Sequence, residues 1–339
     1  MIYDALLERC KQNVNISKMG YEEWLELRKG SIGGSDAGAI MQYIGEWGSS
    51  LTVYLNKKGL AVSKDMSVAA KRGKILEPVI RQYFGETYPG LVIAQVPFML
   101  YHPEYPFMSA NLDGVIMGPE TEINGKKISG LGGLEIKSSK TGYGFGADEI
   151  PDGYYCQVQH YMAVTGLNWF VMAVYFLEAE DIGYYVIERN DDFITKDLIP
   201  AEKNFWENNI EKNEWPAAVG IDSEEEMLTG MFTGGKSLAL GDNERNLCRE
   251  YTEAHATFKE AEEAKKRISI QLKEIIIQRQ SGNSGEKKIS ALAGPYSISW
   301  TRFETSRVDS EALKKDGIYD RYIKKSETGR MTITEKKVS

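Results

Sequence analysis

Residues 133–137 read GLEIK, and this short alternating segment constrains the fold more than any other feature of the chain. Successive side chains of a β-strand point to opposite faces of its sheet. A strand here therefore presents Glu135 and Lys137 on one face, while Leu134 and Ile136 point to the other. The alternation predicts a strand that carries a carboxylate and an amine side by side.

A second carboxylate is expected beside this strand. Asp113 precedes a glycine turn that leads into an apolar strand over residues 115–117, and a Gly-rich insert follows over residues 118–133. A hairpin through the insert would bring Asp113 alongside Glu135. Carboxylate oxygens suit a hard divalent cation, and Lys137 would be close enough to orient or deprotonate a metal-bound water. A turn aspartate and a solvated charge pair are the ordinary alternatives.

Three further blocks accompany these two segments. Arg28 and Ser35 lie in RKGSIGGSDA over residues 28–37, Glu77 lies in RGKILEP over residues 72–78, and Gln157 and Tyr161 lie in QVQHY over residues 157–161. With Asp113 and the Glu135-x-Lys137 pair, these blocks resemble the lambda-exonuclease-like (YqaJ-like) viral recombinases of the PD-(D/E)XK nuclease superfamily. The resemblance covers about residues 24–177, and several ordered blocks are far more specific than any one of them.

The resemblance implies an α/β fold with a restriction-endonuclease-like core, in which helices flank a mixed sheet. Two features depart from the family pattern. Leu112 precedes Asp113 where proline is common, and the insert after Asp113 is longer than the usual connection. The first departure affects only the shape of the turn, and the second could add a hairpin near residues 123–128.

The resemblance also implies Mg²⁺-dependent 5′→3′ degradation of linear double-stranded DNA, which leaves a 3′ single strand for recombination by strand annealing. Mn²⁺ is expected to substitute for Mg²⁺. Asp113, Glu135 and the backbone carbonyl of Ile136 are the implied metal ligands. Glu77 would hold a second metal ion or its water. Lys137 would position or activate the attacking water and offset charge on the phosphate.

The block around Arg28 and Ser35 is expected to bind an anion. Ser35 or Asp36 is predicted to cap a helix over residues 37–41. Free backbone N–H groups at a helix start, next to a guanidinium, favour a bound anion. The resemblance implies that Arg28 and Ser35 hold the terminal 5′-phosphate of the substrate, and a plain N-cap with a surface arginine is the alternative.

A helix predicted over residues 152–166 carries two more residues of the expected site. Gln157 is expected to support the catalytic groups, and Tyr161 to support the bound substrate. Ordinary packing of a helix against the sheet is the alternative for both residues.

Composition and charge limit both the kind of surface that can bind nucleic acid and the cellular compartment in which the protein can work. The chain has 339 residues and a net charge of −8, so a uniformly basic shell is excluded and any nucleic-acid contact must be local. Three widely separated cysteines favour a reducing cytosol. The longest apolar run, residues 169–177, is too short to cross a bilayer. With the resemblance, we expect a cytoplasmic protein of a bacterial host, encoded by a phage or prophage, with no membrane partner.

Three parts are expected along the chain. Residues 1–215 would form the nuclease domain, residues 216–243 a Gly- and acid-rich linker, and residues 244–339 a long helix, a β-hairpin and a tail. Apolar residues recur in a heptad seam along the long helix, with one interruption at Lys265. Such a seam must be buried against another helix, from this chain or from another.

Double-stranded DNA ends are the expected substrate. The related exonucleases typically close a ring of three subunits, so a homo-oligomeric ring is expected, and the C-terminal region could instead dock a single-strand annealing protein. Two other functions stay open: a related endonuclease or junction resolvase, and a non-catalytic DNA-end-binding module. Only an endonuclease would cut a covalently closed circle.

Overall fold

The computed structural model describes residues 2–43, 48–61, 67–235, 237–279, 287–306, 308–323 and 333. The chain divides into two compact units, Met1–Thr233 and Gly234–Ser339. Most of the predicted C-terminal tail lies outside the described residues.

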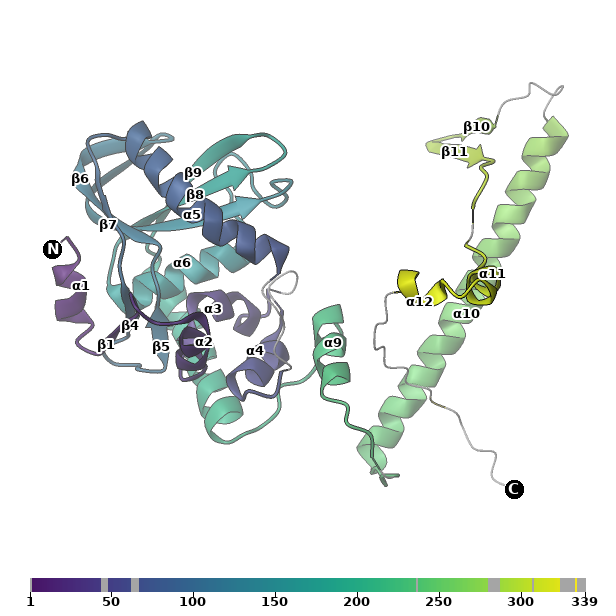
Figure 1. Ribbon diagram of the computed structural model, residues 1–339, viewed down its shortest axis with the longest axis horizontal. Helices are drawn as coiled ribbons and strands as arrows, with labels where there is room; N and C mark the ends of the chain where they lie inside the picture. The colour runs from purple at the N-terminus through teal and green to yellow at the C-terminus, as the bar shows by residue number, and fades with distance from the viewer. Residues whose placement is uncertain are drawn as a thin grey trace. The chain divides into compact units, whose positions relative to one another are not determined.

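The first unit is built on two β-sheets with helices around them (Figure 1). In chain order its elements are α1 (Asp4–Arg9), β1 (Asn13–Asn15), α2 (Tyr21–Lys29), β2 (Ile32–Gly33), α3 (Gly34–Ile40), α4 (Ser50–Lys57), α5 (Val68–Thr87), β3 (Val92–Ala94), β4 (Phe98–Tyr101), β5 (Met108–Ala110), β6 (Gly114–Ile123), β7 (Lys126–Ser139), α6 (Asp152–Thr165), β8 (Trp169–Phe176), β9 (Asp181–Glu188), the consecutive segments α7 (Asp191–Phe193), η1 (Ile194–Leu198), α8 (Ile199–Asn204) and η2 (Phe205–Glu211), and α9 (Asp222–Gly230).

The larger sheet has the strand order β3-β6-β7-β8-β9. Its β7 and β8 strands are parallel and its other neighbours are antiparallel. The smaller sheet has the order β1-β4-β5-β2, with β2 parallel to β5. A mixed sheet flanked by helices confirms the predicted α/β fold class.

Strands β6 and β7 form one long antiparallel hairpin through the predicted insert. Asn124 and Gly125 make its two-residue turn with φ of 47° and 77°, the left-handed values that such turns require. Gly114 pairs with Leu134, and the register shifts within residues 118–121. The insert therefore lengthens the hairpin that carries the expected site, and does not add a separate one.

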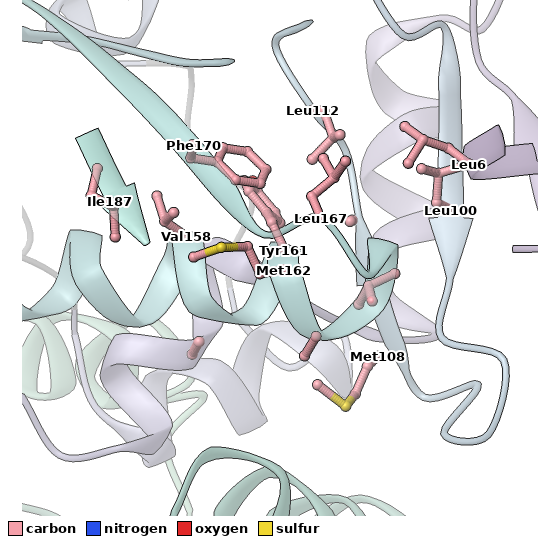
Figure 2. Close-up of a cluster of buried hydrophobic side chains, with 14 of the residues drawn as sticks. Leu6, Leu100, Met108, Leu112, Val158, Tyr161, Met162, Leu167, Phe170 and Ile187 are labelled. Carbon is pink, nitrogen blue, oxygen red and sulfur yellow. The ribbon is translucent and has the colours of Figure 1, made fainter. Parts of the chain in front are cut away.

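Each face of the larger sheet is covered by one long helix. Ile80 and Phe84 of α5 belong to the core on one face, and Figure 1 shows α5 crossing that face. Val158 and Met162 of α6 belong to the core on the other face, where Figure 2 shows them near Phe170 of β8. Alternate residues of β8 therefore enter different cores, which explains its uninterrupted apolar sequence.

Helices α3 and α6 approach each other closely. A Cβ atom added to Gly38 of α3 would lie 2.9 Å from the Cα atom of Gly153 in α6. A side chain at this position would push the two helices apart. The absence of a side chain at Gly38 lets the two backbones meet.

Helix α9 lies within the predicted linker but belongs to the first unit. The Glu224 carboxylate is buried and accepts hydrogen bonds from the Ser49 hydroxyl at 2.5 Å and from the backbone N–H groups of Val219 and Gly220 at 3.0 and 2.8 Å. These bonds fix α9 to the start of α4. The first unit therefore extends to residue 233, beyond the predicted boundary at residue 215.

The second unit consists of α10 (Asp242–Arg279), the antiparallel strands β10 (Lys288–Ala293) and β11 (Tyr296–Thr301), α11 (Ser310–Lys315) and α12 (Tyr319–Tyr322). The long helix and the hairpin therefore lie where the sequence predicts them. None of the described residues of this unit is buried. Across the described parts of the chain, no helix combines the length and the apolar character needed to cross a membrane.

We expect Glu224→Ala to lower the free energy of unfolding of the full chain by about 1–3 kcal/mol, because it leaves buried hydrogen-bond donors without an acceptor. Urea denaturation followed by tryptophan fluorescence measures the change. Glu225→Ala on the exposed side of the same helix is the matched control, with an expected effect within about 0.5 kcal/mol. Equal effects of the two substitutions would contradict the anchoring role of Glu224.

Candidate active site

Asp113 and Glu135 are brought together by the register of the β6–β7 hairpin. Asp113 comes directly before β6, and the pairing of Gly114 with Leu134 sets it beside Glu135. The backbone N–H of Ile136 donates to Asp113 Oδ2 at 2.8 Å, which holds the carboxylate in place. The predicted proximity of these two carboxylates is therefore confirmed.

Glu135 is 2% exposed and forms the centre of a side-chain network. Its Oε1 accepts from Lys137 Nζ at 2.5 Å and from Gln157 Nε2 at 2.7 Å. Gln157 Nε2 also donates to Tyr161 Oη at 3.0 Å. Leu134 and Ile136 point into the α5 core, as the strand alternation predicts. Helix α6 thus contributes both of its predicted residues to the site.

The network opens into a cavity of about 470 Å³. The residues that line it include all of the predicted side chains: Arg28, Ser35, Glu77, Asp113, Glu135, Lys137, Gln157 and Tyr161. Three buried oxygen atoms of lining residues have no hydrogen-bond partner in the described part of the chain: Glu135 Oε2, Gln157 Oε1 and Asn111 Oδ1. Oxygen atoms without partners in a polar cavity can coordinate a hard cation, so this donor set fits Mg²⁺ or Mn²⁺.

Glu77 of α5 lines the same cavity, but its carboxylate pairs with an arginine and not with the Glu135 network. Its Oε1 accepts a hydrogen bond from Arg81, one helical turn later. Within the described ranges, no group of three His, Cys, Asp or Glu side chains is close enough together to hold a metal ion. The structure therefore places Asp113 and Glu135 together, with Glu77 elsewhere on the cavity wall.

The burial of Asp113 and Glu135 close together is electrostatically unfavourable. Burial raises the pKa of Asp113 well above its ordinary value, and the charges of Glu135 and Glu77 raise it further. Burial also raises the pKa of Glu135, although Lys137 opposes that shift. Burial by itself would lower the pKa of Lys137, but the Glu135 and Asp113 carboxylates raise it. The site favours additional positive charge beside two carboxylates, and it keeps the Lys137 amine protonated.

A basic and aromatic wall forms another side of the cavity. Arg28 Nη2 donates to Ser35 Oγ at 2.5 Å, and its guanidinium lies 4.7 Å from the centre of the Trp24 ring. Lys74 Nζ lies 4.1 Å from the centre of the Tyr21 ring. The wall therefore places local positive charge on one side of the cavity of an acidic chain. Trp24, Tyr21 and Lys74 were not predicted from the sequence.

The predicted cap of helix α3 is wrong in position. The helix begins at Gly34 with Gly33 as its N-cap, and the Asp36 carboxylate accepts from the Gly33 N–H at 2.9 Å. Asp36 also pairs with Lys57 Nζ at 2.6 Å. Burial raises the pKa of Asp36, but Lys57 and Arg28 more than offset this and the pKa is lowered. The Asp36 carboxylate is therefore charged and stabilises the fold, and the Ser35 hydroxyl contacts Arg28.

A buried ion pair behind the cavity was also not predicted. His160 Nδ1 lies 2.8 and 3.0 Å from the two Glu202 oxygens, and its Nε2 lies 2.9 Å from the Ser109 carbonyl oxygen. Both ring nitrogens face oxygen atoms, and an imidazolium with a proton on each nitrogen would donate to both of them. Burial lowers the pKa of His160, but Glu202 and the Ser109 carbonyl raise it above its ordinary value. The pair ties α6 and α8 to β5, just before Asn111.

Comparison with known proteins finds a family model that matches part of the chain. Residues 23–168 match the model of the YqaJ-like viral recombinase domain, which confirms the resemblance that the motifs predict. Over 328 residues the chain is 28% identical to the uncharacterized protein YqaJ of Bacillus subtilis (strain 168), and the match covers 94% of this chain and 96% of that protein. The residues that line the cavity all lie in the matched domain, apart from Tyr21.

Two solved structures are similar over about half of the chain. The alkaline exonuclease LHK-Exo of Laribacter hongkongensis has a TM-score of 0.41 and 20% identity, over 56% of this chain and 93% of that one. A phage-related exonuclease from Haemophilus somnus 129PT has a TM-score of 0.37 and 14% identity, over 54% of this chain and 96% of that one.

We expect the stabilising effect of His160 to depend on pH. Its folded-state pKa is raised, so the contribution is fully present below the unfolded-state value of about 6.5 and is lost as the pH rises through the folded-state pKa. His160→Gln should cost about 3–5 kcal/mol of unfolding free energy at pH 5.5, because it breaks a buried pair. Urea denaturation from pH 5.5 to 8.5 should show this cost shrinking at the alkaline end.

The exposed His255 of α10 provides the control for this measurement, and His255→Gln should change the unfolding free energy by less than about 0.5 kcal/mol at every pH. A cost of His160→Gln that stays constant over the whole pH range would mean that the ring is neutral in the folded protein.

Proposed function

We propose that this chain is a Mg²⁺-dependent exonuclease that degrades linear double-stranded DNA from its 5′ ends and leaves a 3′ single strand for strand annealing. The observation that carries the proposal is the meeting of Asp113, Glu135 and Lys137 in one cavity, next to buried oxygen atoms that have no hydrogen-bond partner among the described residues. The match to a viral recombinase domain supports the same class of activity.

The metal-binding role is assigned to oxygen atoms that the network leaves available. Asp113, Glu135 and the carbonyl of Ile136 would hold the first ion, and Glu77 would hold a second ion or its water after release from Arg81. When bound, the metal lowers the pKa of a coordinated water and offsets charge on the phosphate. Mg²⁺ is the expected cofactor, with Mn²⁺ as its substitute, because all of these donors are hard oxygen ligands.

Lys137 would act as a charged group and not as a proton acceptor. Its pKa is raised by the two carboxylates, so the ammonium keeps its proton at neutral and alkaline pH. Glu135 holds the ammonium on the face of β7 that lines the cavity. From there it would orient the attacking water and stabilise negative charge on the phosphate as the bond breaks. Gln157 would keep Glu135 in its orientation through its amide hydrogen bond.

The basic and aromatic wall would receive the end of the duplex. Arg28 and Ser35 would bind the terminal 5′-phosphate, since a guanidinium forms charge-assisted hydrogen bonds with phosphate oxygens. The Tyr161 hydroxyl would support the substrate from α6. The rings of Trp24 and Tyr21 offer surfaces on which an unpaired base can stack. The proposed 5′-phosphate site and the carboxylates line the same cavity, which favours attack from an end.

Assembly around DNA is part of the same proposal. A closed ring of three subunits would retain the duplex without a basic exterior, which suits a chain with a net charge of −8. A single-strand annealing protein would coat the strand that is left. Both partners fit an enzyme of the bacterial cytoplasm that a phage or prophage encodes.

The activity is tested with a linear duplex labelled at either 5′ or 3′ ends and with a covalently closed circle of the same sequence. We expect the linear duplex to be degraded from its 5′ ends with Mg²⁺ and to survive in EDTA, and the circle to stay intact. Cleavage of the circle would indicate an endonuclease or a resolvase. Binding to ends without cleavage would indicate a non-catalytic module.

Asp113→Asn and Glu135→Gln should each reduce the rate of cleavage by about a hundredfold or more, because each removes a charge that the cation and the phosphate chemistry require. The matched control is Glu120→Gln, which removes an exposed carboxylate from the same hairpin. Rates are measured on the linear duplex, and circular dichroism verifies that each variant is folded. A near wild-type rate in either site variant would refute the metal assignment.

Arg28→Ala should reduce the preference for 5′-phosphorylated over 5′-hydroxyl ends by about tenfold, which corresponds to the loss of one or two charge-assisted contacts. Initial rates on the two kinds of end give the preference. Lys29→Ala removes the neighbouring cation, which pairs with Glu26 instead, and should leave the preference unchanged. Equal losses on both kinds of end would make Arg28 a general backbone contact.

A further inference from the structure

Helix α10 of the second unit presents its apolar seam to solvent. The helix has 38 residues and no buried side chain. Its seam residues are 39–63% exposed: Leu247, Tyr251, Phe258, Ile268, Leu272 and Ile275. An apolar seam of this length, on a helix roughly 57 Å long, is stable in water only when another surface covers it.

The charges of α10 are divided between its two halves. Residues 242–263 contain seven acidic and three basic residues, a net charge of −4. Residues 264–279 contain five basic and one acidic residue, a net charge of +4. A partner helix that runs in the opposite direction with the same sequence would therefore meet an opposite charge along its whole length.

The basic half of α10 forms a groove with the β-hairpin. Ile298 and Trp300 of β11 line a space of about 630 Å³ together with Ile268, Leu272 and other residues of the helix. Lys273 Nζ lies 5.4 Å from the centre of the Trp300 ring. The groove is apolar inside and carries lysines on its rim. It suits the apolar residues of an acidic amphipathic helix, and the acidic half of α10 has this character.

We propose that α10 pairs in antiparallel orientation with α10 of a second copy of the chain. The acidic half of each helix then lies in the basic groove of the other, and Leu247, Tyr251 and Phe258 fill the two equivalent grooves. Such an interface is isologous, so it closes after two copies. A parallel pair would instead set acidic half against acidic half and basic against basic.

The arrangement has a defined centre. The midpoint of α10 lies at residues 260 and 261, so a twofold axis near Ala261 aligns both helices over their whole length. Leu247 then lies opposite Ile275, and Ala254 lies opposite Ile268. Small side chains at the crossing point allow the helices to approach closely. The pairing involves the second unit alone and is independent of the nuclease cavity.

Charge reversal in the full-length chain tests the pairing. Glu244 and Glu250 lie in or beside the seam in the acidic half, and Lys265 and Lys273 lie in or beside it in the basic half. We expect Glu244→Lys with Glu250→Lys, or Lys265→Glu with Lys273→Glu, to weaken association about tenfold or more. Light scattering at micromolar concentration should show that the mass falls by half. All four substitutions in one chain should restore the wild-type mass.

The matched control carries Glu263→Lys and Glu274→Lys, which make the same change in charge on the opposite side of the helix. This variant should keep the wild-type mass. A wild-type protein that is monomeric, or whose mass does not respond to either reversal on the seam side, would overturn the proposal. A ring of subunits formed through the first unit does not alter the readout, because loss of the pairing halves the mass of any assembly that it joins.

Cysteine cross-linking tests the orientation. In a background with Cys248→Ser, Ala261→Cys should form an intersubunit disulfide under mild oxidation, because the twofold axis sets this position against itself. Ala254→Cys should not cross-link, since it lies opposite a different residue. Cross-linking at both positions would show a parallel pair and would overturn the antiparallel proposal.

Discussion

The hydrogen bond from the Ile136 N–H to the Asp113 carboxylate is the contact on which the site depends. It fixes Asp113 at the start of β6 and ties it to the middle of β7. The pairing of Gly114 with Leu134 then determines which face each following residue occupies. A slip of one residue would turn Glu135 toward the α5 core and Leu134 toward the cavity. The chemistry of the cavity thus follows from strand register and not from a flexible loop.

This placement has an electrostatic cost that the surroundings offset only in part. Two carboxylates lie in a partly buried site where each disfavours the charge of the other. Lys137 and Gln157 both interact with the same oxygen of Glu135, and Glu135 Oε2 has no partner among the described residues. The two carboxylates therefore keep a local excess of negative charge that Lys137 offsets only in part, while the wall around Arg28 carries further cationic residues on another side of the cavity. A protein with a net charge of −8 can still attract phosphate through that wall.

Much of the site could be predicted because short patterns of neighbouring residues in the sequence specify it. The alternation at residues 134–137 specifies the faces of β7, and the spacing from Gln157 to Tyr161 is one helical turn of α6. Contacts between residues distant in the sequence could not be predicted from it. His160 reaches Glu202 and Glu224 reaches Ser49 only through the fold. Such partners show no periodic pattern, since each pair depends on how whole elements pack.

The contact between Gly38 and Gly153 has a consequence for the size of the reaction product. Helix α3 carries Ser35, which contacts Arg28 of the wall that would grip the end of a strand, and α6 carries Gln157 and Tyr161 beside the carboxylates that would cut it. Because their backbones are already in close contact, the two helices cannot move closer to each other. In the proposed exonuclease, the enclosure would then act as a fixed-length gauge, and successive products released from one end would contain the same number of nucleotides.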